Sequence, residues 1–266
     1  MNGLMKVQYR NIDYEVANDP SREAFFVFGV RKSGSSILNS MLGAVARING
    51  IQYVDVAGKL FERGLTVAGW QNDAAMARIL YPGNLYGGYR NFPAGLRGAD
   101  IFVRSRKVLL VRDPRDALVS EYFSNAYSHS IPAEGEARQD MLSRRAVALG
   151  SAIEDYVLRM APALKRTLAE YTCLGRDDRL LTFRYEDVIT RKDKLLTDIC
   201  AFFGWTLSDQ QLRQILGWAD VIPTEERPTE FVRKVTPGDH IEKLSAETID
   251  RLDRLLSEEM TYYGYR

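Results

Sequence analysis

Residues 29–36, "GVRKSGSS", place two glycines, a lysine and several serines directly after the apolar run "FFVF". This pattern predicts a buried strand over 24–29, a loop, and a helix over 35–47. Such a unit aims free backbone N–H groups and the positive end of a helix dipole at one point, which suits a phosphate. Lys32 would add a full charge. The alternative is an ordinary strand-to-helix turn that uses glycine for its geometry.

The position of the lysine argues against an ATP-hydrolysing loop. In nucleotide hydrolases a lysine directly follows the second glycine and reaches the β- and γ-phosphates. Here Ser35 follows Gly34, and Lys32 comes earlier, on the other side of the turn. The sequence also lacks a clean apolar strand that ends in a magnesium-binding aspartate. A kinase or nucleotide hydrolase is therefore disfavoured.

A second segment, "KVLLVRDPRDALVSEYF" (107–123), gives a more specific signal. Its apolar run predicts a strand buried on both faces, and Asp113-Pro114 is typical of a helix start. Arg112 then stands at the carboxyl end of a strand, where open α/β sheets bind ligands. Arg112 and Ser120 could both reach one phosphate. The alternative is an arginine that only pairs with Asp113 or Asp116.

Length and composition limit the classes of protein that the chain can represent. A chain of 266 residues with 45% apolar and 27% charged residues is long enough for one sizeable α/β domain. Its net charge of +1 gives no global case for binding nucleic acid. Two cysteines give neither a disulfide framework nor metal-ligand spacing, and no apolar run reaches the roughly 18 residues that span a bilayer. We expect a cytoplasmic protein.

Strands and helices alternate along the chain, which predicts a central parallel sheet flanked by helices and connected by right-handed crossovers. No low-complexity linker divides the sequence, so a single domain over 1–266 is expected. Residues 57–106 show weak periodicity and are interpreted as irregular, with a helix near 71–80. Strands are expected at 24–29, 51–56 and 107–111 and within 179–188. Helices are expected at 35–47, 113–127, 136–171 with a break near Pro162, 191–203, 208–218 and 246–262.

Together the two segments resemble the sulfotransferases that use 3′-phosphoadenosine 5′-phosphosulfate (PAPS). Lys32-Ser33-Gly34-Ser35-Ser36 matches that family's K-[ST]-G-[ST]-[ST] loop for the 5′-phosphosulfate, and Arg112 with Ser120 matches its 3′-phosphate motif. "RKVTPGDH" (233–240) is similar to the family's C-terminal R-K-G-x-x-G-[DE]-W, and "RYEDV" around Tyr185 to its adenine-side segment. The resemblance implies a P-loop-nucleotide-hydrolase-like sulfotransferase fold, PAPS as co-substrate and no metal.

The sequence departs from the family near the adenine and in the C-terminal motif. Ile37 stands where the family usually has a tryptophan, and Trp218 is a candidate for the other adenine face or a core residue. Val235 and His240 replace a glycine and a tryptophan. The expected cofactor-binding set is Arg31, Lys32, Ser33, Gly34, Ser35, Ser36, Arg112, Ser120, Tyr185, Trp218, Arg233 and Lys234.

The largest departure from the family pattern concerns the general base. Many cytosolic members carry K-x-H between the two phosphate motifs, but "LYGGYRNFP" contains no histidine. His129, Glu62 and Asp55 are the candidates, each with a surface or structural role as the alternative. We expect Lys32 to stabilise the leaving group, and His129 or Glu62 to act as the base.

The acceptor is not identified by these residues, and a small molecule or a carbohydrate is expected. The oligomeric state stays open, and a homo-oligomer is possible. A catalytically inactive nucleotide-binding protein of the same fold is a further alternative, consistent with the missing histidine.

Overall fold

A five-stranded parallel sheet forms the centre of the protein, in a computed structural model that describes residues 4–230 and 232–266. The strand order is β4-β5-β3-β6-β7. This architecture confirms the predicted α/β fold with a central parallel sheet. The strands are β3 (Phe25–Gly29), β4 (Gln52–Asp55), β5 (Asn84–Tyr89), β6 (Arg106–Val111) and β7 (Leu180–Arg184).

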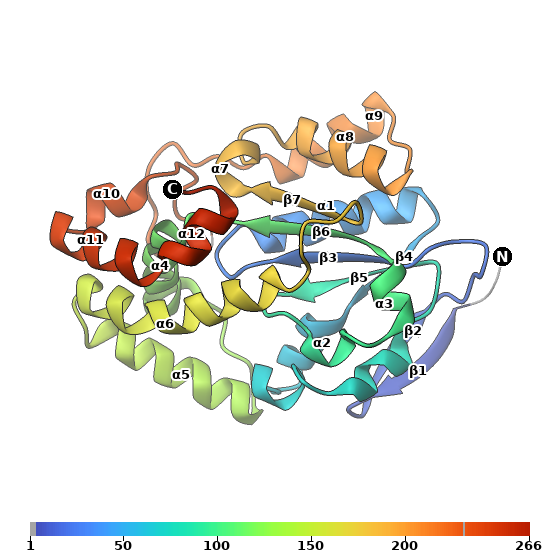
Figure 1. Ribbon diagram of the computed structural model, residues 1–266, viewed down its shortest axis with the longest axis horizontal. Helices are drawn as coiled ribbons and strands as arrows, with labels where there is room; N and C mark the ends of the chain where they lie inside the picture. The colour runs from blue at the N-terminus through green and yellow to red at the C-terminus, as the bar shows by residue number, and fades with distance from the viewer. Residues whose placement is uncertain (1–3, 231) are drawn as a thin grey trace.

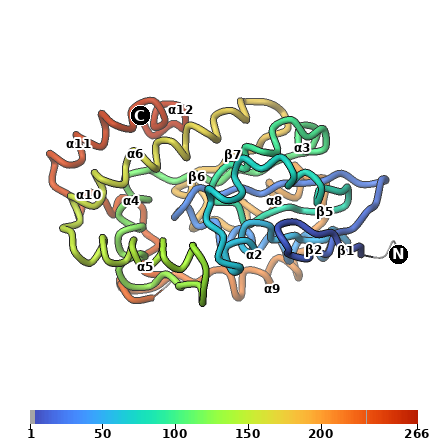
Figure 2. The backbone as a smooth tube through the Cα atoms, turned by 90° about the horizontal axis from the view of Figure 1, so that it is seen from below, coloured from blue at the N-terminus to red at the C-terminus, as the bar shows by residue number. Residues whose placement is uncertain are grey.

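Helices cover both faces of the sheet. On one face α1 (Ser35–Ile48), α8 (Lys192–Phe203) and α9 (Asp209–Ala219) pack through a cluster of buried apolar side chains. A second cluster joins the other face to α4, α6, α11 and α12, and Figure 2 shows α6, α11 and α12 opposite α9. The bounds of these and the remaining helices are α2 (Val56–Glu62), α3 (Asp100–Arg104), α4 (Pro114–Phe123), α5 (Gly135–Leu149), α6 (Ile153–Thr172), α7 (Tyr185–Val188), α10 (Asp239–Lys243), α11 (Ala246–Leu255) and α12 (Ser257–Tyr263).

The strands β5, β6 and β7 all point toward the side of the molecule where α4, α10 and α11 lie (Figure 1). The N-terminal hairpin of β1 (Met5–Tyr9) and β2 (Ile12–Val16) lies at the opposite end. Loops that follow the strands therefore gather at one edge of the sheet, which is where such folds bind ligands.

Several details differ from the sequence prediction. β5 and α2 fall in the segment interpreted as irregular, because "NLYGGY" carries two glycines that weaken a strand signal. The helix expected at 71–80 is a 3₁₀-helix over Ala74–Ile79. The expected break at Pro162 is wrong: α6 continues through it, and Pro162 is exposed, so water can satisfy the carbonyl that the proline leaves unpaired. The break falls instead between α5 and α6.

None of the described helices combines the length and the apolar character needed to cross a membrane.

Candidate nucleotide site

The loop between β3 and α1 is held in a tight turn by its own backbone. Lys32 and Gly34 both adopt positive φ angles, of 64° and 83°. Gly34 is required because a Cβ there would lie 3.3 Å from the Tyr185 ring in a conformation that side chains rarely adopt. The Ser33 N–H and hydroxyl both donate to the Val30 carbonyl, at 3.1 Å and 2.6 Å. Ser33 therefore shapes the loop, and its hydroxyl proton points inward.

The start of α1 supplies the anion-binding part of this loop. Gly34 occupies the N-cap and provides no side-chain cap, so the first N–H groups of the helix have no intrahelical partner. Such N–H groups are suited to an anion because the helix dipole favours negative charge there. Ser35 and Ser36 lie in this first turn, as the sequence predicts.

Arg112 lies at the carboxyl end of β6 and faces the same loop. It is buried, and its Nη1 donates to the Lys32 carbonyl at 3.1 Å. Its guanidinium also lies over the Tyr185 ring, 4.4 Å from the ring centroid. The buried Nε has no hydrogen-bond partner in the structure. An unpaired buried donor is costly, so this group is suited to a phosphate oxygen.

Positive charges converge on the loop from segments far apart in the sequence. The pKa of Lys32 falls to about 8, first because the amine is buried and then because the charges of Arg112, Arg90 and Arg233 lie near it. The Glu121 carboxylate opposes this shift. A cluster of cations at the carboxyl ends of three strands is chemically suited to a ligand with several negative charges.

Arg90 was not recognised from the sequence. It follows β5 directly, and its guanidinium donates to the Gly88 carbonyl at 2.5 Å and to the Ser36 hydroxyl at 3.0 Å. The signal that the sequence carries is an arginine directly after the glycine-containing run "LYGGY". Arg90 therefore joins the loop from the neighbouring strand.

Arg31 has a different partner from the other cations. Its Nη1 bonds the buried Glu121 carboxylate of α4 at 3.0 Å, and its Nε is buried without a partner. Arg144 of α5 lies 3.7 Å from the same carboxylate. The structure thus ties the loop to α4 through Arg31, and direct nucleotide contact by this residue stays a prediction.

Arg233 lies in the C-terminal segment, and its charge acts on Lys32, but carboxylates already surround it. Its guanidinium pairs with Glu226 and Asp239 and lies over the Phe123 ring, 4.2 Å from the centroid. Phe123 is three residues after Ser120 on α4, so the two side chains share a helix face. Lys234 pairs with Asp239 at 3.0 Å and Glu242 at 2.7 Å. Both cations are therefore ion-paired, and their contact with a phosphate stays a prediction.

Asp116 fastens the C-terminal segment to α4. Its carboxylate accepts from the N–H groups of Gly238 and His240 at 2.7 Å and 2.9 Å, and from His240 Nδ1 at 2.6 Å. Burial raises the pKa of Asp116, but these bonds and the Arg112 charge outweigh burial and lower it to about 2. The ion pair between Arg112 and Asp116, considered as an alternative, exists at 3.9 Å and leaves Arg112 Nε unpaired.

The adenine-side residues are only partly brought together. Tyr185 packs against the loop, and its hydroxyl donates to the Val235 carbonyl at 3.1 Å. Ile37 and Ile189 line a hollow beside it. Trp218 lies at the end of α9 with 46% of its surface exposed. It does not line that hollow, so its role at the adenine stays a prediction.

The candidates for the base occupy different environments. Glu62 is exposed at the end of α2, and Asp55 caps the same helix by accepting from the Gly58 N–H at 2.8 Å. His129 is partly buried, and its pKa is lowered by burial and by the charges of Lys32 and Arg90. The charge of Lys32 in the loop therefore acts on the His129 ring.

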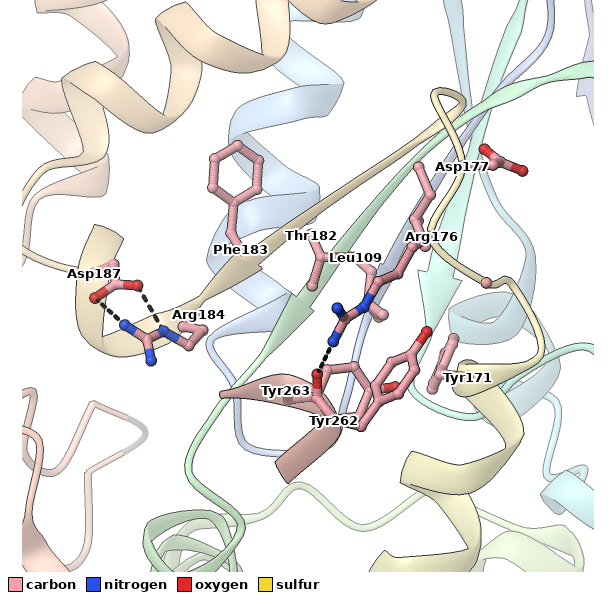
Figure 3. A pocket seen from close by; sticks show the side chains of 12 residues that line it. Leu109, Tyr171, Arg176, Asp177, Thr182, Phe183, Arg184, Asp187, Tyr262 and Tyr263 are labelled. Atoms are coloured by element: carbon pink, nitrogen blue, oxygen red, sulfur yellow. Dashed lines mark hydrogen bonds and ion pairs between the residues drawn. The ribbon is translucent and has the colours of Figure 1, made fainter. Parts of the chain in front are cut away.

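A cavity of about 560 Å³ lies beside β7, between α6 and α12 (Figure 3). Arg176 there donates to the Tyr262 carbonyl at 2.9 Å, and Arg184 bonds Asp187 at 2.7 Å. The residues that line the cavity include none of the expected cofactor-binding set. Its two arginines are already engaged, so the cavity adds nothing to the proposed phosphate site.

Comparison with solved structures supports the fold. A mouse sulfotransferase complexed with PAP (adenosine 3′,5′-bisphosphate) matches with a TM-score of 0.60 and 14% identity, over 96% of this chain and 94% of that one. Retinol dehydratase in complex with androsterone and PAP matches with a TM-score of 0.57 and 13% identity, over 97% and 90%. At these identities the likeness concerns the fold alone. No curated protein matches the chain.

The sequence itself matches a family model. The model for the sulfotransferase domain covers residues 101–264, more than half of the chain. This range contains the strand of Arg112, the α4 helix and the C-terminal segment of Arg233. The chain therefore belongs to the sulfotransferase domain family.

Proposed function

We propose that the protein transfers the sulfuryl group of PAPS to a hydroxyl or amine of a small-molecule or carbohydrate acceptor. The observation that carries this proposal is the convergence of Lys32, Arg112 and Arg233 at the carboxyl edge of the sheet. A nucleotide with separate phosphates at its 5′ and 3′ positions needs cations from distant segments, and the unpaired Arg112 Nε offers one of the required donors. The family and the PAP-bound relatives support the same nucleotide.

In the proposed reaction the acceptor oxygen or nitrogen attacks sulfur in line, and the bond between sulfur and the bridging oxygen breaks. The electron pair of that bond stays on the 5′-phosphate. Lys32 and the N–H groups at the start of α1 stabilise this charge, and a base receives the acceptor proton. Arg112, Ser120 and Arg233 hold the 3′-phosphate, while Tyr185 lies by the adenine. Alignment and charge stabilisation thus account for the protein's contribution.

A small-molecule acceptor has support in the comparisons, since retinol dehydratase of the same fold binds androsterone. The proposal for this chain covers hydroxyl and amine acceptors generally. A phenol, a steroid alcohol, an amine and a simple glycoside would sample these classes.

The test has a binding arm and a transfer arm. PAP should raise the melting temperature of the protein, whereas ATP with magnesium should raise it much less, because stabilisation follows ligand affinity for the folded state. Transfer of ³⁵S-labelled sulfate from PAPS to the acceptor panel should then be detected. Stabilisation by ATP–magnesium alone would favour a kinase or hydrolase. PAP binding without transfer to any acceptor would favour a non-catalytic nucleotide-binding protein.

A further inference from the structure

The helix α4 ends in an unusual way. Instead of an ordinary cap, Phe123 is followed by a π-helical turn over Ser124–Ser128. The His129 N–H closes this turn by donating to the Ser124 carbonyl at 2.7 Å. Such wide turns are rare, and those that occur are often found at functional sites. Here the turn determines where the next residue, His129, leaves the helix.

Arg145 of α5 holds this π-turn in place. Its Nε donates to the Asn125 carbonyl at 3.2 Å, and its Nη2 donates to the His129 carbonyl at 2.7 Å. One planar guanidinium thus connects both ends of the turn. The Asn125 side chain also donates to the Tyr156 hydroxyl of α6 at 2.6 Å. The backbone that carries His129 is therefore fixed by two neighbouring helices.

The hydrogen bond of the imidazole defines its tautomer. Nδ1 lies 2.8 Å from the Ser130 carbonyl oxygen. A carbonyl can only accept, so Nδ1 must carry the proton. Nε2 then holds the lone pair and is the atom able to accept a proton. The ring edge packs against Phe61 of α2, with centroids 6.0 Å apart.

The surroundings of the ring favour a neutral imidazole. Burial lowers the pKa of His129, and the charges of Lys32 in the loop and Arg90 after β5 lower it further. The bond to the Ser130 carbonyl and the Glu121 carboxylate of α4 act in the opposite direction. The net shift is downward, so the lone pair on Nε2 is available at neutral pH.

We propose that His129 is the general base of the reaction and that Arg145 is a positioning residue which holds it in this orientation. The inference rests on the proposed sulfuryl transfer. As the acceptor oxygen forms its bond to sulfur, the acceptor proton moves to His129 Nε2, and the imidazolium later releases it to water. The sulfur–oxygen bond to the 5′-phosphate breaks with its electron pair on the phosphate. This base comes from the end of α4, whereas the K-x-H motif would place it after the strand that precedes Arg90.

The first test needs no acceptor. The chain has only 2 histidines, so imidazole-nitrogen NMR of the full protein gives one set of signals each for His129 and His240. His129→Gln assigns the signals. We expect His129 in the Nδ1–H form at pH 7.5, with a pKa below its usual value. Arg145→Gln should shift His129 toward the Nε2–H form and toward its usual pKa, and leave His240 unchanged.

Arg138→Gln is the matched control, because Arg138 lies on the same helix and donates to the Pro132 carbonyl at 3.1 Å, outside the π-turn. It should leave the His129 signals unchanged. An Nε2–H tautomer in the wild type would overturn the assignment of His129. Unchanged His129 signals in Arg145→Gln would overturn the role of Arg145.

The second test measures transfer to an acceptor that the wild type sulfates. His129→Gln should lower kcat by about 10²–10⁴-fold, the usual contribution of a general base. PAP affinity should stay within about twofold of the wild type. Arg145→Gln should lower kcat by about tenfold with KM for PAPS unchanged, and Arg145→Lys should recover part of the loss. The acid limb of the pH–kcat profile should move in the Arg145 variants, which a purely structural role would not cause.

The outcomes separate this inference from the proposed function. Near-normal transfer by His129→Gln would refute the base assignment while sulfuryl transfer itself stands. Binding of PAP without transfer by the wild type would refute the proposed function, and the NMR result would then decide only the geometry of the π-turn and its Arg145 contact.

Discussion

The two ends of the proposed nucleotide site are formed by different kinds of structural elements. At the 5′ end, a short continuous segment of strand, loop and helix offers backbone N–H groups and Lys32. At the 3′ end, the donors come from α4 and from the C-terminal segment, and Arg233 already pairs with Glu226 and Asp239. The first end is local and positively charged. The second is assembled from distant segments and is partly neutralised.

This difference has an energetic consequence. A phosphate at the 5′ end meets N–H groups at the start of α1 that have no intrahelical partner, close to the buried Lys32 amine. At the 3′ end a phosphate must share Arg233 with two carboxylates. Arg112 differs from Arg233 because its Nε is buried and unpaired. Substitutions should therefore have effects that decrease from Lys32 through Arg112 to Arg233.

The largest effect is expected for Lys32→Ala. Loss of one donor to a developing negative charge typically lowers kcat by about 10²–10³-fold. PAP affinity should fall much less, since Lys32 acts most strongly on the charge that develops in the transition state. Single-turnover transfer and calorimetry with PAP measure the two quantities. Near-normal turnover by the variant would show that the 5′ end does not stabilise the leaving group.

Arg112→Ala should have the next largest effect, on binding. Charged hydrogen bonds contribute roughly 1.5–3 kcal/mol each, so PAP affinity should fall by about tenfold to more than a hundredfold. Affinity for adenosine 5′-phosphate, which lacks the 3′ group, should hardly change. Arg233→Ala should weaken PAP binding less than Arg112→Ala does, because Arg233 already shares its charge with the Glu226 and Asp239 carboxylates. Calorimetry with both nucleotides decides this, and equal losses for both would mean that Arg112 only supports the fold.

The charge of the 5′ end should also depend on pH. Since burial and nearby cations lower the pKa of Lys32 to about 8, the free protein loses this positive charge as the pH rises through that value. PAP affinity should then be constant below the pKa and fall by at most about tenfold per pH unit above it. Binding at pH 8.5 should take up protons, because the bound phosphate favours the charged amine. Calorimetry in buffers of different ionisation enthalpy measures this uptake.

Lys32→Ala is the control for the pH experiment. The variant should show no proton uptake near pH 8.5 and a flatter dependence of affinity on pH. The same slope in the variant as in the wild type would assign the titration to another group.

The same contrast explains what the sequence could predict. The 5′ end is local: Lys32 to Ser36 follow a strand and open a helix, so composition and spacing predict their arrangement. Arg112 was also predictable, because a buried strand, a proline and a helix N-cap surround it. These predictions needed only neighbours along the chain.

Other features depend on contacts between distant segments. The hydrogen bond between Arg90 and Ser36 requires the pairing of β3 with β5. The two glycines of β5 weaken its strand signal in the sequence, so this pairing is not predicted. Arg145 of another helix donates to both ends of the π-turn before His129, and local propensity contains no information about such contacts. The pairing of Arg233 with Glu226 likewise arises from a loop that returns to the site. Side-chain partners of this kind follow from the tertiary structure.

The smallest expected effect has the opposite sign and tests the neutralised end directly. Glu226 is partly exposed, and its pKa is lowered because its bonds to Lys243 and Arg233 outweigh burial, so it is a carboxylate at neutral pH. Glu226→Gln should remove a competitor for Arg233 and tighten PAP binding by about two- to fivefold, the scale of a partly exposed ion pair. Glu225→Gln is the control, since Glu225 is mostly exposed and pairs with Arg227, which is not in the expected cofactor-binding set. Calorimetry with PAP measures both variants. Weaker binding by Glu226→Gln alone would mean that Glu226 orients Arg233 for the phosphate and that the 3′ end, like the 5′ end, is preorganised.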